Sequence, residues 1–295
     1  MDWFYKFPHM EDESLLGLKK AIDEGFRSFT RTHGDTIDAL FDPLQQFLLF
    51  AERLLTQTPW PIVILVVLAI AWFSSRSLKV VGSCLAVLLA IGYFDMWEDT
   101  MRTVAMIFVS TLLAIAIGIP VGILMSRSDR FQRFINPFLD VMQTMPSFVY
   151  LIPVVMLLGI GRVPGLIAVV IYALPPMIRL TNLGIRLVDK DIIEAADAFG
   201  SSAWQRLVKV QLPLALPTIM AGVNQTIMMA LAMVVVASMI GVQGLGQPVL
   251  KAIANQYFTL GLFNGFAIVG IAIIFDRVSQ AYGKRLQRHQ EVAHG

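Results

Sequence analysis

The sequence predicts an all-α protein that crosses a membrane several times. Of its 295 residues, 56% are hydrophobic and only 15% are charged. In ordinary soluble domains about a quarter of the residues are charged, so this composition indicates a polytopic membrane protein. The apolar residues also gather in long runs separated by short polar segments, which is the pattern of transmembrane helices.

Seven apolar stretches follow a mixed N-terminal segment. They lie near residues 58–73, 78–96, 102–125, 135–158, 163–179, 214–240 and 258–281. Each is long enough, or nearly so, to cross a hydrocarbon core of roughly 30 Å. Pro146 and Pro153 interrupt the fourth, and neighbouring helices can satisfy the carbonyls that such prolines free. We therefore expect about seven transmembrane helices.

The N-terminal segment, residues 1–57, has a different pattern. Two runs place apolar residues at helical spacing among polar ones: Leu15, Leu16, Leu18, Ile22, Phe26 and Phe29 in the first, and Leu40, Phe41, Leu44, Phe47, Leu48 and Leu55 in the second. Both predict amphipathic helices that lie on the membrane surface or pack on the spans. The acidic start of the chain lacks the basic-then-apolar order of a cleavable signal peptide.

The placement of Lys and Arg predicts the orientation in the membrane. Basic residues gather in alternate loops and in the C-terminal tail: Arg76, Lys79, Arg127, Arg130, Arg133, Arg186, Lys190, Arg206, Lys209, Lys284, Arg285 and Arg288. The loops between them are poorer in basic residues. We therefore expect the N-terminus outside, the C-terminus in the cytoplasm, and residues 191–213 on the cytoplasmic side.

The sequence lacks the residues that several functional classes require. The middles of the predicted spans contain almost no ionisable side chains, which proton- or ion-coupled carriers need. The chain has no Gly-x-x-x-x-Gly-Lys-Ser/Thr phosphate-binding loop, no metal-ligand spacing and no catalytic constellation. Its single cysteine, Cys84, cannot form an internal disulfide. We expect no metal, no nucleic-acid partner and no enzyme activity, with any energy supplied by a partner protein.

A polar segment from Asp191 to Pro213 stands out between apolar runs. Asp191 with Glu194 resembles a helix-capping box, and Ser202 with Gln205 forms a second one. Gly200 between them suits a left-handed helix end. These signals predict a helix, a sharp turn, a second helix and then a span. Local chemistry alone also fits an ordinary amphipathic connector.

The spacing within this segment is more specific. Glu194-Ala195-Ala196, Gly200, Val210 and Leu212-Pro213 stand at the separations of the EAA loop, and the chain thus resembles the permease subunits of ABC importers. Val210 replaces the commoner isoleucine. The resemblance implies that this loop is a coupling helix that docks on a separate ATPase. Glu194 would then fix the loop by capping or a salt bridge, Ala195 and Ala196 would allow close approach, and Trp204 and Leu207 would supply apolar contacts.

Shorter motifs resemble the glycine betaine, proline betaine and choline branch of this family, over about residues 36–281. Gln143-Thr144-Met145-Pro146-Ser147 is similar to an element near the translocation path, and Leu157 to Gly161 is similar to the run that follows it. Gly241, Gly244 and Gly246 resemble a glycine-rich turn on the outer side. Met233 could line the path, although methionines more commonly fill cores. Gly118 and Gly122 favour close packing within the chain over a dimer face.

The resemblance implies a type I importer permease fold in a bacterial inner membrane. It divides the chain into the tail 1–57, two accessory spans in 58–98, a core of five spans in 99–283 with the coupling loop 191–213, and a cytoplasmic tail 284–295. The implied partners are a second permease copy, two ATPase subunits that carry ATP and magnesium, and an external substrate-binding protein. Three alternatives stay open: an importer of another small solute such as an amino acid, a self-contained channel or carrier, and a membrane scaffold.

Overall fold

The structure, a computed structural model, is helical throughout the part of the chain that it describes. It describes the backbone of residues 10–293 and the side chains of residues 10–283 except those of Asp35 and Asp38, so residues 1–9 and 294–295 of the two predicted tails lie outside it. The helices are α1 Asp12–Gln57, α2 Trp60–Ser75, α3 Leu78–Tyr93, α4 Trp97–Arg127, α5 Asp129–Thr144, α6 Ser147–Leu158, α7 Arg162–Arg186, α8 Lys190–Ala198, α9 Ala203–Arg206, α10 Leu212–Ala237, α11 Gly246–Asn255 and α12 Phe258–Ala293.

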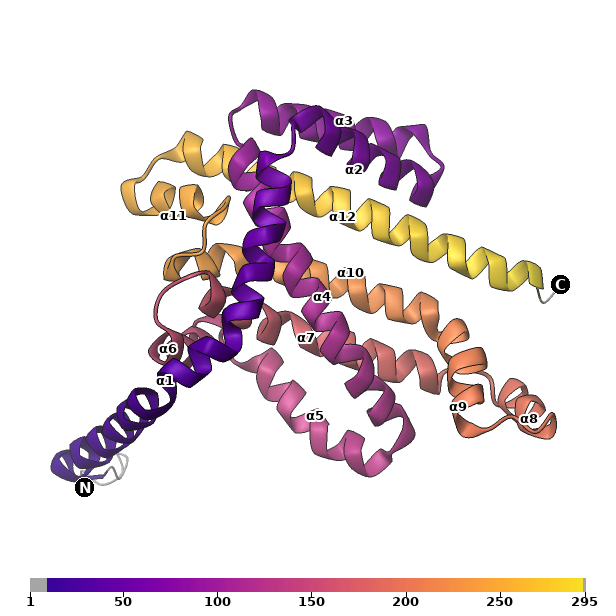
Figure 1. Ribbon diagram of the computed structural model, residues 1–295, viewed down its shortest axis with the longest axis horizontal. Helices are drawn as coiled ribbons and strands as arrows, with labels where there is room; N and C mark the ends of the chain where they lie inside the picture. Colours follow the sequence, from indigo (N-terminus) through magenta and orange to yellow (C-terminus); the bar gives the residue numbers. More distant parts are fainter. Residues whose placement is uncertain (1–9, 294–295) are drawn as a thin grey trace, which may run out of the picture.

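The core of the molecule is the contact of α7 with α4 on one side and α10 on the other (Figure 1). Glycines make this approach possible. A Cβ at Gly118 would lie 2.6 Å from Cγ of Met177, and a Cβ at Gly122 would lie 2.6 Å from Cβ of Thr181, both on α7. On the other side of α7, Gly184 meets Thr218 of α10 at 2.9 Å in the same way. The pair Gly118 and Gly122 therefore packs helices within the chain, as expected.

The remaining long helices surround this core. α12 packs against α10 and also against α2, α3 and α11, and α2 and α3 pair with each other beside it (Figure 1). Buried apolar residues of α4, α7, α10 and α12 form one cluster that includes Met106, Leu166, Met233 and Ile271. The side chain of Asn224 on α10 donates to Asp276 on α12 at 3.0 Å and accepts from Ser279 at 2.5 Å. These polar contacts fix how α12 is rotated against α10.

The N-terminal segment forms one helix, not the two that the sequence predicts. α1 runs without interruption from Asp12 to Gln57 and contains Pro43. Its first part extends away from the bundle, and its last part packs against α4 and α6 (Figure 1). Gly34 and Pro43 do not end the helix, because a single glycine costs only about 1 kcal/mol in a helix and a proline can be accommodated with a kink.

The structure contains fewer candidate spans than the seven apolar stretches. Among the described residues, four helices are long and apolar enough to cross a membrane, namely 97–127, 162–186, 203–240 and 258–283, and the number rises to six if two bent helix pairs each count as one span. The pairs are the end of α1 with α2, bent by 106°, and α5 with α6, bent by 100°. α3 has only 16 residues, or about 24 Å of helix.

The α5–α6 bend has a clear physical origin. Met145 and Pro146 are both extended, with ψ of 132° and 135°. Proline has no N–H to continue the helix and disfavours helical geometry in the residue before it. The fourth apolar stretch is therefore two helices joined by a sharp bend rather than one kinked helix.

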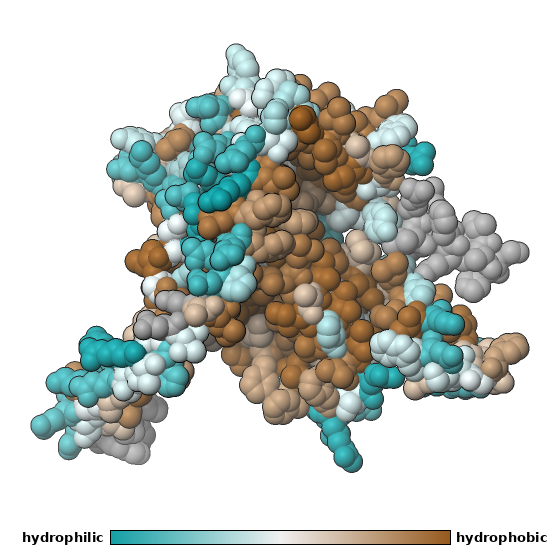
Figure 2. Space-filling model, viewed as in Figure 1, coloured by the Kyte–Doolittle hydropathy of each residue, from teal (hydrophilic) through white to brown (hydrophobic). Residues whose placement is uncertain are grey.

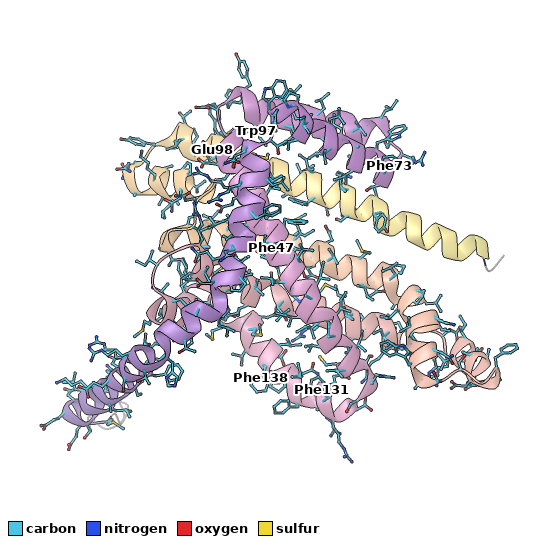
Figure 3. All side chains as sticks on the ribbon, in the orientation of Figure 1. Phe47, Phe73, Trp97, Glu98, Phe131 and Phe138 are labelled. Atoms are coloured by element: carbon cyan, nitrogen blue, oxygen red, sulfur yellow. The ribbon has the colours of Figure 1, made fainter. Side chains whose placement is uncertain are left out.

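The polar residues gather at opposite ends of the bundle. An apolar surface covers the middle of the face shown in Figure 2, with hydrophilic residues over α1, α8 and α9. Trp97 and Glu98 mark the start of α4 in Figure 3, whereas Arg127 at its other end donates to the backbone oxygen of Ala203 in α9. The start of α4 and the α8–α9 segment therefore lie at opposite ends of α4.

The glycine contacts generate a stability prediction. Gly122→Ala places a methyl group within 2.9 Å of the Ile178 carbonyl oxygen, so helices α4 and α7 must separate. We expect the variant to lose about 1 to 3 kcal/mol of stability, the usual cost of overpacking. Gly265→Ala on α12 meets nothing within 4 Å and serves as the matched control, which we expect to be neutral or slightly stabilised. Unfolding midpoints of the purified variants in detergent measure both, and equal midpoints would contradict the packing argument.

Candidate coupling loop and translocation segment

The predicted coupling loop is a compact helical hairpin. α8 begins at Lys190 and is capped by Asp189, whose side chain accepts a hydrogen bond from the backbone N–H of Asp191 at 2.9 Å. The prediction of a capping box at Asp191 and Glu194 is therefore wrong by two residues. Asp189 and Asp191 both offer a capping carboxylate, and the sequence signal does not distinguish them. Glu194 is exposed and forms no ion pair among the described residues.

A left-handed turn reverses the chain between the two helices. Gly200 has φ of +75°, the N–H of Gly200 donates to the Asp197 oxygen, and the N–H of Ser201 donates to the Ala196 oxygen. These are the two bonds of a Schellman motif, which satisfies the last carbonyls of α8. A Cβ at Gly200 would meet nothing within 4 Å, so backbone conformation alone requires glycine here.

The second helix of the hairpin starts as the sequence predicts. The N–H of Gln205 donates to the Ser202 hydroxyl at 3.2 Å, and the N–H of Ser202 donates to the Gln205 side chain at 2.9 Å. A π-helical turn from Leu207 to Gln211 then joins α9 to α10 without a break. Pro213 therefore lies in the first turn of α10, where the missing N–H of proline is tolerated.

An ion pair that the sequence analysis missed closes the hairpin. Arg206 contacts both carboxylate oxygens of Asp197, at 2.6 and 2.5 Å. The two residues are nine positions apart, and only the turn at Gly200 brings them together. A single guanidinium nitrogen of Arg206 donates to both oxygens, and such charge-assisted hydrogen bonds are stronger than neutral ones. The contact expected of Glu194 is thus made by Asp197, one turn of α8 later.

The hairpin is also anchored to the bundle. Leu207 is only 1% exposed and packs with Met177, Ile185 and Ala215 of α7 and α10. It is therefore covered in this structure and offers no surface to a partner, unlike the role expected for it. Val210 and Leu212 are half-buried and Pro213 is exposed.

The outer surface of the hairpin is apolar where the turn is sharpest. Phe199 is 91% exposed and Trp204 is 66% exposed. Ala195 is exposed beside them, and Ala196 is half-buried. The sequence analysis named Trp204 but not Phe199, although Phe199 directly precedes the predicted turn glycine. Two large exposed rings on a rigid hairpin form a surface suited to binding another protein.

The segment Gln143–Ser147 lies at the bend between α5 and α6. Gln143, Thr144 and Pro146 are exposed, whereas Met145 and Ser147 are half-buried. The bend breaks the helical ladder of a long apolar stretch. Non-helical backbone within a membrane segment is found where it lines a cavity or is buried in protein. Met233 is 1% exposed inside the main core cluster. It therefore fills the core and does not line open space.

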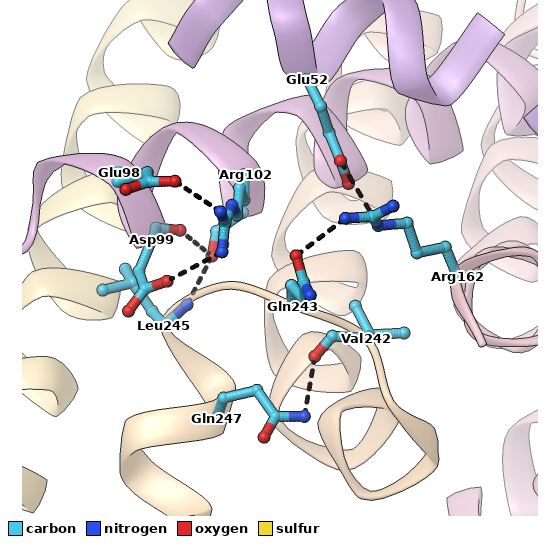
Figure 4. A network of polar contacts seen from close by, with 10 residues as sticks. Glu52, Glu98, Asp99, Arg102, Arg162, Val242, Gln243, Leu245 and Gln247 are labelled. Carbon is cyan, nitrogen blue, oxygen red and sulfur yellow. Dashed lines mark hydrogen bonds and ion pairs between the residues drawn. The ribbon is translucent and has the colours of Figure 1, made fainter. Parts of the chain in front are cut away.

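The predicted glycine-rich turn connects α10 to α11 at the opposite end of the bundle. Gly241 and Gly244 have φ of +89° and +132°. The N–H of Leu245 donates to the Thr103 hydroxyl of α4 at 2.9 Å (Figure 4). A Cβ at Gly244 would lie 2.5 Å from that hydroxyl oxygen, and one at Gly246 would lie 2.1 Å from the Ser238 hydroxyl oxygen. Close backbone approach therefore requires both glycines.

A second polar network at this end ties α1 to the core. Glu52 of α1 lies 3.4 Å from Nε of Arg162 at the start of α7, and Arg162 donates to the Gln243 side chain at 2.8 Å (Figure 4). A cavity of about 480 Å³ lies beside it, with Phe41, Asp42 and Gln45 of α1 in its wall. No local signal in the sequence pairs Arg162 with Glu52, which lies 110 positions earlier in the chain.

The structure shows no group of three or more His, Cys, Asp or Glu residues that could hold a metal ion within the part of the chain it describes. At the two ends the side chains instead form ion pairs and amide hydrogen bonds, or expose apolar rings. They can position helices and bind another protein.

Comparison with known proteins identifies the family. Residues 114–288 match the family model of the binding-protein-dependent transport system inner membrane component. The chain is 46% identical over 272 residues to the Escherichia coli glycine betaine/proline betaine transport system permease protein ProW, covering 92% of this chain and 77% of that protein. It is 49% identical over 234 residues to the Listeria monocytogenes glycine betaine/carnitine transport permease protein GbuB, covering 77% and 81%. It is 42% identical over 265 residues to the Bacillus subtilis glycine betaine transport system permease protein OpuAB, covering 90% and 94%.

A solved structure supports the fold. An inward-facing MetNI methionine ABC transporter chain matches with a TM-score of 0.57 and 22% identity, covering 62% of this chain and 92% of that one. At this identity the likeness concerns the fold alone. With the family match and the relatives, the chain belongs to the binding-protein-dependent transport system inner membrane components: it is a multi-pass permease subunit of an ABC importer and not an enzyme.

Proposed function

We propose that this permease carries glycine betaine and related quaternary amines, such as choline, into the cytoplasm, driven by a separate ATPase subunit. Glycine betaine appears in the names of all three relatives described above, and they align with 77% to 92% of this chain. The likeness to the methionine transporter is one of fold and does not favour an amino acid as substrate. The family further implies an ATPase and a binding protein as partners.

The exposure of the α8–α9 hairpin is the observation that supports a role in coupling. Phe199 and Trp204 project from a turn that Gly200, the capping box and the Asp197–Arg206 pair hold rigid. The π-helical turn makes α9 continuous with α10, and Leu207 locks it against α7. A displacement of the two rings by a docked ATPase would therefore move α7 and α10 together.

The assembly completes the pathway. Two copies of the chain and two ATPase subunits form the transporter, with the five-helix core of residues 99–283 lining the path and an external binding protein delivering substrate. The N-terminus lies outside and the C-terminus in the cytoplasm. The exposed segment Gln143–Ser147 forms the bend between α5 and α6 and lines the path there. Closure of the ATPases on ATP opens the permease outward, and hydrolysis returns it to the inward-facing state.

Reconstitution tests the substrate and the energy source together. The permease is co-purified with the ATPase and binding protein encoded beside it and placed in liposomes, and uptake of labelled glycine betaine and choline is measured with and without ATP. Uptake that requires ATP and the binding protein is expected. An active ATPase complex that takes up neither solute would contradict the substrate, and uptake by the permease alone would contradict the coupling.

The backbone at Gly200 generates a matched pair of variants. Gly200→Val places a β-branched residue at φ of +75°, a conformation that such residues rarely adopt, whereas asparagine tolerates it. We expect Gly200→Val to lower ATP-dependent uptake at least about tenfold, since a cost of 1 to 3 kcal/mol falls on this turn. Gly200→Asn should keep most of the activity. Equal uptake by the two variants would show that the turn geometry does not matter for coupling.

The exposed rings of Phe199 and Trp204 lead to a second set of variants. Phe199→Ala and Trp204→Ala should each reduce the amount of ATPase that co-purifies, because truncating an aromatic anchor at an interface typically costs 2 kcal/mol or more. The unfolding midpoint of the permease should stay unchanged, since both side chains are exposed. Leu78→Ala, at a side chain that is 76% exposed on α3, is the control and should retain the ATPase. Full ATPase retention by both ring variants would place the docking surface elsewhere.

A further inference from the structure

We infer that Tyr150 is the residue that holds the broken span α5–α6 in its bent geometry and so positions the segment Gln143–Ser147. The hydroxyl of Tyr150, in the first turn of α6, donates to the backbone oxygen of Met142 in the last turn of α5. This bond crosses the bend directly. The inference deepens the proposed function, because it rests on that segment lining the transport path.

The bond supplies a donor that the helix cannot provide. In a continuous helix the Met142 oxygen would accept from the N–H of residue 146. Residue 146 is proline, which has no N–H, while the preceding Val141 oxygen still accepts from Met145 at 2.9 Å. The Met142 carbonyl is therefore the first one that Pro146 deprives of its partner. A carbonyl left without a donor in a low-dielectric environment costs about 1 to 3 kcal/mol.

The ring of Tyr150 is fixed as firmly as its hydroxyl. Tyr150 is buried, and its ring lies edge-on to that of Tyr172, with 6.5 Å between the centroids. Tyr172 belongs to α7 and packs against the main core cluster, and Leu151, next to Tyr150, is part of that cluster. Tyr150 thus connects three elements: its backbone lies in α6, its ring rests on α7 and its hydroxyl holds α5.

The other contacts of α5 tie it to α4 and α7. Leu139, the one fully buried residue of α5, packs with Met125 of α4 and Ile178 of α7. Two ion pairs also join α5 to α7, Asp140 with Arg179 at 2.5 Å and Asp129 with Arg186 at 2.7 Å. Their side chains are partly exposed, and exposed ion pairs contribute little, roughly 0 to 1 kcal/mol. The Tyr150 hydroxyl, in contrast, ties α5 directly to α6 across the bend.

Two hydroxyl deletions in the same ring pair form the test. Tyr150→Phe removes the donor to Met142 and leaves the ring. Tyr172→Phe is the matched control, since the described contacts of Tyr172 are those of its ring. Both are made in a Cys84→Ser background with spin labels at Arg133→Cys on α5 and Met156→Cys on α6. The labelled permease is assembled with the ATPase and an excess of unlabelled copies of the same variant.

The readouts are the distance distribution between the labels and the rate of ATP-dependent uptake. For Tyr150→Phe we expect a broader distribution and uptake lowered at least about fivefold, with the ATPase still bound, whereas Tyr172→Phe should match the parent in both. An unchanged distribution in Tyr150→Phe would overturn the inference, and so would a broadened one with uptake at the parent level. A merely stabilising role would lower the unfolding midpoint without broadening the distribution.

A second variant keeps the test decisive if Tyr150→Phe folds poorly. Adding Pro146→Ala restores an N–H that can donate to Met142 within a straight helix. The double variant should fold and show a longer label distance with uptake still low, and recovery of parent uptake would overturn the inference. If the parent complex takes up neither glycine betaine nor choline, the proposed substrate fails, and the label distances still decide the role of Tyr150 in the bend.

Discussion

The close contact of α7 with α4 and α10 is the constraint on which the other features depend. Gly118, Gly122 and Gly184 remove the side chains that would keep these helices apart, so backbone and methyl groups meet directly. In a membrane, such packing replaces much of the hydrophobic driving force that assembles soluble proteins. Because α7 runs from Arg162 at one end to Arg186 at the other, it connects the two polar ends of the bundle through this contact.

The two ends are built differently, in keeping with different tasks. At the end with Arg162, side chains tie separate elements together through Glu52 and Gln243, and glycines let the turn approach α4. At the other end the α8–α9 hairpin is held by its own bonds and presents Phe199 and Trp204 outward. The first arrangement joins separate elements of the chain, and the second leaves two aromatic rings exposed.

The sequence predicts most local features of the coupling loop, apart from the first helix start at Asp189, but not the long-range ones. The glycine turn at Gly200 and the Ser202–Gln205 box depend on neighbouring residues, and both are confirmed. The Asp197–Arg206 pair and the burial of Leu207 depend on how the hairpin folds back, which local spacing does not encode. Apolar length likewise reveals a span near 135–158 but not its break by 100°, because hydropathy is indifferent to backbone direction.

We propose that the hairpin at Phe199 docks on the ATPase. A photo-reactive phenylalanine analogue at position 199 in the assembled transporter tests it directly, with the same analogue at Tyr93, an exposed residue at the end of α3, as the reference. We expect a crosslink from position 199 to the ATPase subunit and none from position 93. Crosslinking of the ATPase from position 93 but not from position 199 would contradict it.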